Sequence, residues 1–152
     1  MKALTTLLVV GMFLMPAALA DDVDDVKAVV QGYSDTERAG DVNARVQYMA
    51  AGNTRFGPGG GLLERNDSLE EQRKSQQAAR DAGLKLNLQD RHIEVSVYGN
   101  STAVATSYKM GNITFPGGRT SRPNSRITWV LIKQGGQWKI AHMHISPVVI
   151  PQ

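Results

Sequence analysis

Cysteine is absent from this chain of 152 residues, which excludes disulfide bonds as a source of stability. Small exported domains often depend on disulfides because their hydrophobic cores are limited. Here the core has to stabilise the fold alone. Residues 21–152 are enough for one domain with a substantial core and too few for a second domain that binds a separate cofactor. We therefore expect a single domain over residues 21–152 and no cofactor.

No hydrophobic run after residue 20 is long enough to cross a bilayer. The first twenty residues have the pattern of a secretory signal peptide, with Lys2, an apolar run over Ala3–Met15, and the small residues Ala18 and Ala20 before the expected cut. The apolar run is itself too short to span a membrane. We predict cleavage after Ala20, a periplasmic or secreted protein, and no membrane partner.

Carboxylate side chains are absent after Glu94, where six basic residues remain. All fourteen acidic residues lie from Asp21 to Glu94, together with ten basic residues. This distribution favours a surface or pocket that accepts anions. Aromatic residues make up only 6% of the chain and do not interleave with the scattered basic residues, so we expect no nucleic-acid partner.

Hydrophobic periodicity predicts helices first. Val26, Val30 and Tyr33 recur at the spacing of one helix face. The predicted helices cover Val23–Ala39, the segment from the Asp41 cap to Met49, and the segment from the Ser68 cap to about Ala82. Glycines between residues 52 and 63 indicate a small hairpin, or a strand and a loop. They do not form a phosphate-binding loop, because no Lys-Ser/Thr pair follows.

From Leu84 onward the period changes to two, which predicts strands. They cover Lys85–Tyr98, Thr102–Phe115, Arg119–Lys133 (interrupted by Pro123) and Gln137–Val148, and tight turns join them. Four such strands form an antiparallel meander. Helices followed by a sheet predict an α+β fold with the helices packed on one face of the sheet.

Simple alternation predicts the two faces of the closing hairpin. One face of its last strand would carry Trp138, Ile140, His142, His144 and Ser146, and the other Lys139, Ala141, Met143 and Ile145. Both faces are then substantially apolar, so we expect a second subunit to cover one of them in a homodimer that associates through the sheet. A bulge near Asp90 or Pro123 would invert the alternation.

The chain resembles a known superfamily in several motifs. They are a Gly-Asp pair between the first two helices, a Gly-Pro-Gly-rich loop, and the ending RITWVLIKQGGQWKIAHMHIS. Together they resemble the nuclear transport factor 2-like superfamily, in particular its SnoaL-like branch. The final W-x-I-x-H-x-H-x-S strand also resembles the association domain of calcium/calmodulin-dependent kinase II. The resemblance covers essentially all of residues 21–152.

This resemblance implies a cystatin-like cone, in which a curled antiparallel sheet and the N-terminal helices enclose a pocket, and dimerisation through the sheet. Family members include isomerases, cyclases, dehydratases and epoxide hydrolases, and others only bind ligands or assemble partners. Several of the enzymes use an aspartate on a later strand as general base, whereas this chain has no carboxylate after Glu94. A carboxylate base would have to be Asp35, Glu37, Asp90 or Glu94.

His142 and His144 lie two residues apart on one predicted strand, so their side chains share a face about 7 Å apart. Histidine titrates near neutral pH, which makes them the candidate catalytic acid–base pair lining the cone. The alternatives are hydrogen bonds to neighbouring strands, a place in the dimer contact, or a zinc site with His92 as third ligand. Nothing in the sequence places His92 over the pair, so we predict no metal site.

Four further residues are candidates for ligand binding. Arg126, in the part of the chain that lacks acids, could hold a carboxylate or phosphate of the ligand, or it could pair with Glu94 or Asp90. Tyr33, Tyr108 and Trp129 could line an apolar pocket, with the tyrosine hydroxyls facing the ligand. The alternative for such aromatic residues is packing in the core.

We therefore expect an exported protein that binds a small apolar ligand, either with or without an anionic group. If it is an enzyme, the expected chemistry is histidine-driven isomerisation, dehydration or cyclisation. The alternative is a non-catalytic dimer that scaffolds or inhibits a periplasmic protein. The enzyme needs an enclosed pocket that both histidines reach. The scaffold needs those histidines at the subunit contact and a cone filled by core side chains.

Overall fold

A computed structural model describes residues 17–149, with side chains from residue 21 onward. Most of the predicted signal peptide, residues 1–16, lies outside the described residues. The helices and strands follow the expected order, so the α+β class is confirmed. No helix within the described part of the chain is both long and apolar enough to cross a membrane.

The three helices are α1 (Ala17–Ala39), α2 (Val42–Val46) and α3 (Leu69–Asp81). Both predicted N-caps are confirmed, because Asp41 accepts a hydrogen bond from the Ala44 amide at 2.9 Å and Ser68 accepts one from the Glu71 amide at 3.3 Å. Helix α2 ends earlier than expected because Met49 already belongs to the first strand.

Seven strands form one sheet, with β5 pairing only with β4 and the others in the order β2-β1-β7-β6-β4-β3. The strands are β1 (Met49–Phe56), β2 (Glu64–Asn66), β3 (Lys85–Tyr98), β4 (Thr102–Thr114), β5 (Thr120–Ser121), β6 (Asn124–Gln134) and β7 (Gln137–Pro147). The expected meander is confirmed over β3, β4, β6 and β7. The parallel pairing of β1 with β7 was not predicted, because it joins segments about ninety residues apart.

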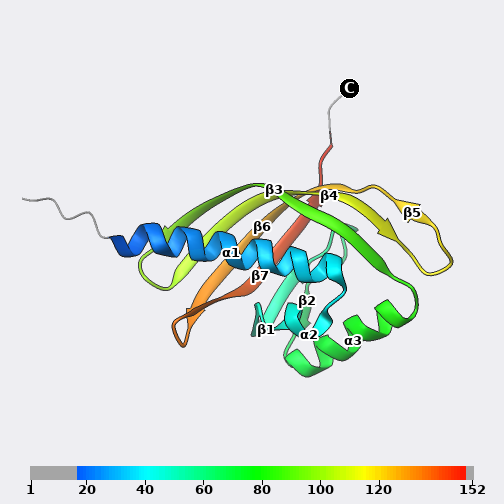
Figure 1. The fold of residues 1–152 in the computed structure, drawn as a ribbon, viewed down its shortest axis with the longest axis horizontal. Coiled ribbons are helices and arrows are strands. Elements are labelled where there is room, and N and C mark those ends of the chain that lie inside the picture. Colours follow the sequence, from blue (N-terminus) through cyan, green and yellow to red (C-terminus); the bar gives the residue numbers. More distant parts are fainter. Residues whose placement is uncertain (1–16, 150–152) are drawn as a thin grey trace, which may run out of the picture.

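The sheet curls around α1, which lies along one face of it (Figure 1). We call this face the inner face and the opposite one the outer face. Val26, Val30 and Tyr33 of α1 are buried against inner-face side chains of the sheet, which include Ala103, Ala105, Ile127, Trp129, Leu131 and Ile140. At the start of the helix, Asp22 accepts hydrogen bonds from Lys133 (2.5 Å) and Trp138 (3.0 Å) and ties α1 to the β6–β7 hairpin.

A bulge in β7 changes which of its side chains share a face of the sheet. In β7, Ile140 pairs with Leu131 and His142 with the adjacent Val130, which leaves Ala141 as an extra residue. Trp138 and Ile140 are therefore buried on the inner face, while His142 and His144 lie on the outer face. The predicted shared face of Trp138, Ile140 and the two histidines is wrong for this reason.

The bulge also removes the argument for a dimer. Met143 and Ile145 join Trp138 and Ile140 on the inner face, so the apolar side chains of β7 concentrate on one side of the sheet. The outer face of β7 then carries mostly polar side chains, which water can solvate. The homodimer stays a prediction, without the support of two apolar faces.

Candidate functional site

The six residues predicted to form one site lie on two faces of the sheet. Tyr33 and Trp129 are buried on the inner side, with their rings 5.6 Å apart in an edge-on contact. The other four, Tyr108, Arg126, His142 and His144, lie on the outer face. Tyr33 and Trp129, two of the predicted ligand-binding residues, therefore lie together. The sheet separates them from the predicted pair of His142 and His144.

Trp129 belongs to the core. Its side chain is completely buried, and its Nε1 donates a hydrogen bond of 2.9 Å to Ser107 Oγ. The Ser107 hydroxyl in turn donates to Asp90 Oδ1 at 2.6 Å. An indole that is fully buried and hydrogen-bonded in this way stabilises the core. This is the alternative given above for the aromatic residues, packing in the core instead of contact with a ligand.

Charged side chains are buried beside Tyr33. Lys109 Nζ lies 2.7 Å from Glu37 Oε2 and 3.5 Å from Asp90 Oδ2, and Arg45 Nη1 lies 3.4 Å from Glu37 Oε1. Lys109 also lies 5.4 Å from the centre of the Tyr33 ring. These charged groups form ion pairs with one another in a low-dielectric interior. Removal of any one of them would therefore lower the free energy of unfolding.

Asp90 and Glu37 have different surroundings within this cluster. Asp90 accepts hydrogen bonds from Ser34 and Ser107 and also contacts Lys109, so both of its oxygens are engaged in the core. This position also rules out the predicted alternative that Asp90 pairs with Arg126. Glu37, by contrast, lines a partly open pocket.

That cavity, of about 230 Å³, lies between α1, α3, β1, β2 and the inner face of the sheet. We call it the inner pocket. Tyr33, Leu86 and Met143 line it with apolar surface, and Glu37, Arg45, Arg55, Glu64 and Arg80 line it with charged groups. It is the part of the cone that core side chains leave open.

The buried surroundings shift the pKa values of two groups, Tyr33 in the lining of the inner pocket and Lys109 beside it. Burial raises the pKa of Tyr33 above its ordinary value of 10.0, and the nearby Glu37 carboxylate adds to this, so the phenol stays neutral and can donate a hydrogen bond. Burial opposes the charge of Lys109, but the Glu37 and Asp90 carboxylates outweigh it and raise the pKa of this ammonium above 10.5. Lys109 is therefore a permanent buried cation.

On the outer face, His142 is held between β1 and β7. Its Nδ1 lies 2.7 Å from Thr54 Oγ1, and the Phe56 ring lies 5.8 Å from His142 and 5.6 Å from His144. Burial, together with the neighbouring His144, lowers the pKa of His142 below 6.5. Neither histidine lines the inner pocket.

The lesser alternative of a zinc site receives no support from the geometry. Within residues 21–149, no three His, Asp or Glu side chains are grouped so that they could hold a metal ion. His92 instead lies against Tyr108, with the two rings 6.3 Å apart.

The fold agrees with comparisons to known proteins. A family model described as the SnoaL-like domain matches residues 26–151. The chain belongs to the SnoaL-like family. It has the nuclear transport factor 2-like fold, also called cystatin-like, as the motifs in the sequence predicted. No protein of curated function matches the sequence at a significant level.

Several solved structures share this SnoaL-like fold at low sequence identity. A ketosteroid isomerase-like protein from Erwinia carotovora atroseptica aligns with a TM-score of 0.72 and 16% identity over 86% of this chain and 98% of that protein. A protein proposed to be a scytalone dehydratase, from Novosphingobium aromaticivorans, aligns with a TM-score of 0.73 and 10% identity over 87% of each chain. At these identities the likeness concerns the fold alone.

The second resemblance found in the sequence also has a structural counterpart. A protein from Xanthomonas campestris, assigned as a calcium/calmodulin-dependent kinase II association domain, aligns with a TM-score of 0.64 and 18% identity. The alignment covers 81% of this chain and 85% of that protein.

Sequence reasoning missed several residues of this SnoaL-like site. Glu37 and Asp90 were among the possible carboxylates, but Lys109 and Arg45, which hold Glu37, were not singled out. The sequence contains part of the signal for Lys109, because this residue alternates with Ser107 and Ala105 on the inner side of β4. What could not be read was the contact between Lys109 and Glu37, which lie 72 residues apart.

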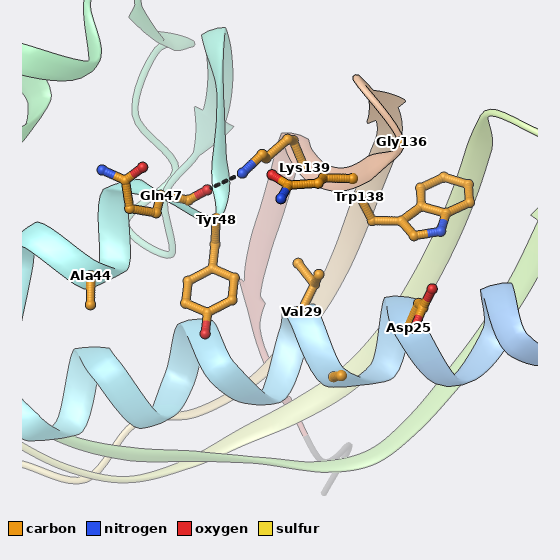
Figure 2. A pocket seen from close by; sticks show the side chains of 10 residues that line it. Asp25, Val29, Ala44, Gln47, Tyr48, Gly136, Trp138 and Lys139 are labelled. Atoms are coloured by element: carbon orange, nitrogen blue, oxygen red, sulfur yellow. Dashed lines mark hydrogen bonds between the residues drawn. The ribbon is translucent and has the colours of Figure 1, made fainter.

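A second, more open groove contains none of the predicted site residues. It lies between α1, the end of α2 and the β6–β7 turn, where Val29, Tyr48 and Trp138 supply apolar surface (Figure 2). Lys139 Nζ crosses it to donate to the carbonyl oxygen of Gln47 at 2.6 Å (Figure 2). This cation is thus already satisfied by the fold.

Proposed function

We propose that this SnoaL-like protein binds a small molecule with an apolar body and an anionic group in the inner pocket. The observation that supports this most directly is the charge of the pocket lining. Arg45, Arg55 and Arg80 line the cavity together with only two carboxylates, Glu37 and Glu64. An anion would balance this excess of positive charge. From the signal-peptide pattern of residues 1–20, we propose the periplasm or the outside of the cell as the location of this function.

The walls of the inner pocket suit a small ligand. Tyr33, Leu86 and Met143 offer apolar contacts, and the cavity of about 230 Å³ is below the range of about 300–1,000 Å³ that holds drug-sized molecules. The Tyr33 hydroxyl, kept neutral by burial, supplies a hydrogen-bond donor. The ligand we propose is therefore a compact monocarboxylate or a molecule of similar size and charge.

Binding without catalysis is the part of the function that the geometry favours. His142 and His144 lie on the outer face, so the predicted histidine-driven proton transfer would not act on a ligand in the inner pocket. Glu37 lines the inner pocket, but Lys109 and Arg45 engage both of its oxygens. Two of the similar structures are named as an isomerase-like protein and a proposed dehydratase. In this chain, acid–base chemistry in the inner pocket would use Tyr33 and Glu37.

Calorimetry with a pair of probes tests the proposal. Hexanoate carries a short apolar chain and a carboxylate, and hexan-1-ol has the same chain without the charge. We expect hexanoate to bind and hexan-1-ol to bind at least roughly tenfold more weakly, because only the carboxylate can pair with the arginines.

Two neighbouring alanines of α3 provide a matched pair of variants. Ala79 lines the inner pocket, whereas Ala78 is exposed. Ala79→Phe should fill the pocket and abolish hexanoate binding, and Ala78→Phe should leave it unchanged. Equal binding by the two variants, or no binding by the unmodified protein, would overturn the proposed pocket. The second result would leave the dimeric scaffold, which requires the two histidines at the subunit contact and an interior filled by core side chains.

A further inference from the structure

All three histidines of the chain lie on the outer face, and two bulges place them there. Asp90 faces inward on β3, so regular alternation would also turn His92 inward, yet His92 is exposed. The bulge between Arg91 and Glu94 reverses the alternation, and His92 has a positive φ of 53°. The bulge at Ala141 does the same for His142 and His144. Bulges and strained backbone often aim side chains at functional sites.

A groove of about 460 Å³ lies where these residues converge, roughly twice the volume of the inner pocket. We call it the outer groove. It crosses β3, β4, β6 and β7, and its polar lining includes His92, Glu94, Tyr108, Arg126, His144 and Ser146. It shares no lining residue with the inner pocket.

Arg126 is the charge in the outer groove that is available to a ligand. Its Nε donates to Ser146 Oγ at 3.0 Å, which orients the guanidinium on the sheet. Among residues 21–149 it forms no ion pair, whereas Arg55 on β1 pairs with Glu64. A guanidinium with a fixed plane and free N–H groups suits a carboxylate, which it can hold with two hydrogen bonds.

Aromatic side chains stand beside this cation. The Tyr108 ring lies 6.3 Å from the His92 ring at an interplanar angle of 84°, and Tyr108 is paired with Arg126 across β4 and β6. Tyr108 is about half exposed, so one side of its ring remains open to the groove. A planar ring joined to a carboxylate would contact Tyr108 and Arg126 together.

We propose that the outer groove is a second ligand site, which takes an aromatic carboxylate with its carboxylate on Arg126 and its ring against Tyr108 and His92. This site is independent of the proposed function of the inner pocket. Glu94 lines the same groove and opposes an anion there, so it tunes the affinity.

Benzoate is the probe, and the histidine side-chain signals in proton NMR are the reporters. Benzoate should shift the signals of His92 and His144, and acetate should shift them at concentrations at least roughly tenfold higher, because it lacks the ring. Arg126→Gln should weaken benzoate binding roughly tenfold or more. Glu94→Gln should tighten it severalfold, because an opposing charge is removed.

Two control variants separate this site from others. Arg122→Gln, at an exposed arginine four residues away, should leave benzoate binding unchanged. Ala79→Phe should also leave it unchanged, which separates this result from the fate of the inner pocket. Three outcomes would overturn the proposal: no histidine shift with benzoate, equal effects of Arg126→Gln and Arg122→Gln, or shifts that follow only dilution of the protein, as expected if a second copy covers the face.

Discussion

At the scale of single residues, the interior depends on the buried cation of Lys109. Lys109 lies between Glu37 and Asp90, two carboxylates that are themselves buried. Transfer of such groups from water is unfavourable, and only mutual pairing offsets the cost. The inner pocket therefore owes the position of Glu37, and through it the position of Arg45, to one lysine on β4.

Lys109→Met should lower the free energy of unfolding by about 3–5 kcal/mol, because it leaves a buried carboxylate without its partner. Urea unfolding followed by circular dichroism measures this. Lys85→Met, at an exposed lysine on β3, should change stability by no more than about 0.5 kcal/mol. Glu37→Gln added to Lys109→Met should recover part of the loss. If the double variant is no more stable than Lys109→Met, the charge explanation is wrong.

His142 offers a second residue-scale test, through its pKa. Burial and the neighbouring His144 lower this pKa below 6.5, so NMR should find His142 more than half neutral at pH 6.5. His144→Gln should raise the pKa of His142 part of the way toward 6.5, since one of the two causes is removed. Because the pKa is depressed in the folded state, the associated stability is complete above pH 6.5 and is lost as the pH falls through the folded-state pKa. A normal titration of His142 would contradict its burial beside His144.

At the scale of the elements, the bulges in β3 and β7 decide what each face of the sheet carries. Alternation read from the sequence placed Trp138, Ile140 and both histidines together, and one extra residue, Ala141, separates them. Asp90 and Pro123 were the two places named where a bulge would invert the alternation, and the register shift between Arg91 and Glu94 lies close to the first of them. The bulge in β7 was not anticipated, because no glycine or proline marks Ala141 as an interruption.

The pairing of β3 with β4 depends on a glycine, which gives a test at this scale. Gly111 has a φ of 140°, and a Cβ there would lie 2.1 Å from the backbone oxygen of Asn87. Gly111→Ala would push the two strands apart, so we expect a loss of about 2 kcal/mol or more in the free energy of unfolding. Gly59→Ala, where a Cβ would meet nothing within 4 Å, is the matched control and should be nearly neutral. Comparable losses in the two variants would contradict the close approach of β3 to β4.

At the scale of the whole molecule, stability should fall at alkaline pH. The pKa values of Tyr33 and Lys109 are both raised in the folded state. Their contribution is therefore complete below the ordinary values of 10.0 and 10.5 and is lost as the pH rises through the folded-state values. Urea unfolding at intervals from neutral pH to pH 11 measures the decline. Tyr33→Phe should flatten it, whereas Tyr98→Phe, at a tyrosine that is 60% exposed, should not.

Much of the molecule follows from local signals. The caps at Asp41 and Ser68, the period-two segments and the turns determined the helices, the four long strands and the α+β class, because each depends on residues a few positions apart. The Gly-Asp pair, the Gly-Pro-Gly-rich loop and the closing hairpin were together sufficient to predict the SnoaL-like family.

The candidate sites needed contacts between distant segments. The parallel pairing of β1 with β7, the ion pair of Lys109 with Glu37, and the faces on which the histidines lie all involve long-range registers or bulges. Such contacts are chosen by packing and by the energy of satisfying buried charges, and neither is encoded in spacing along the chain. For that reason one site predicted from the sequence became two, an inner pocket beside Tyr33 and an outer groove beside Arg126.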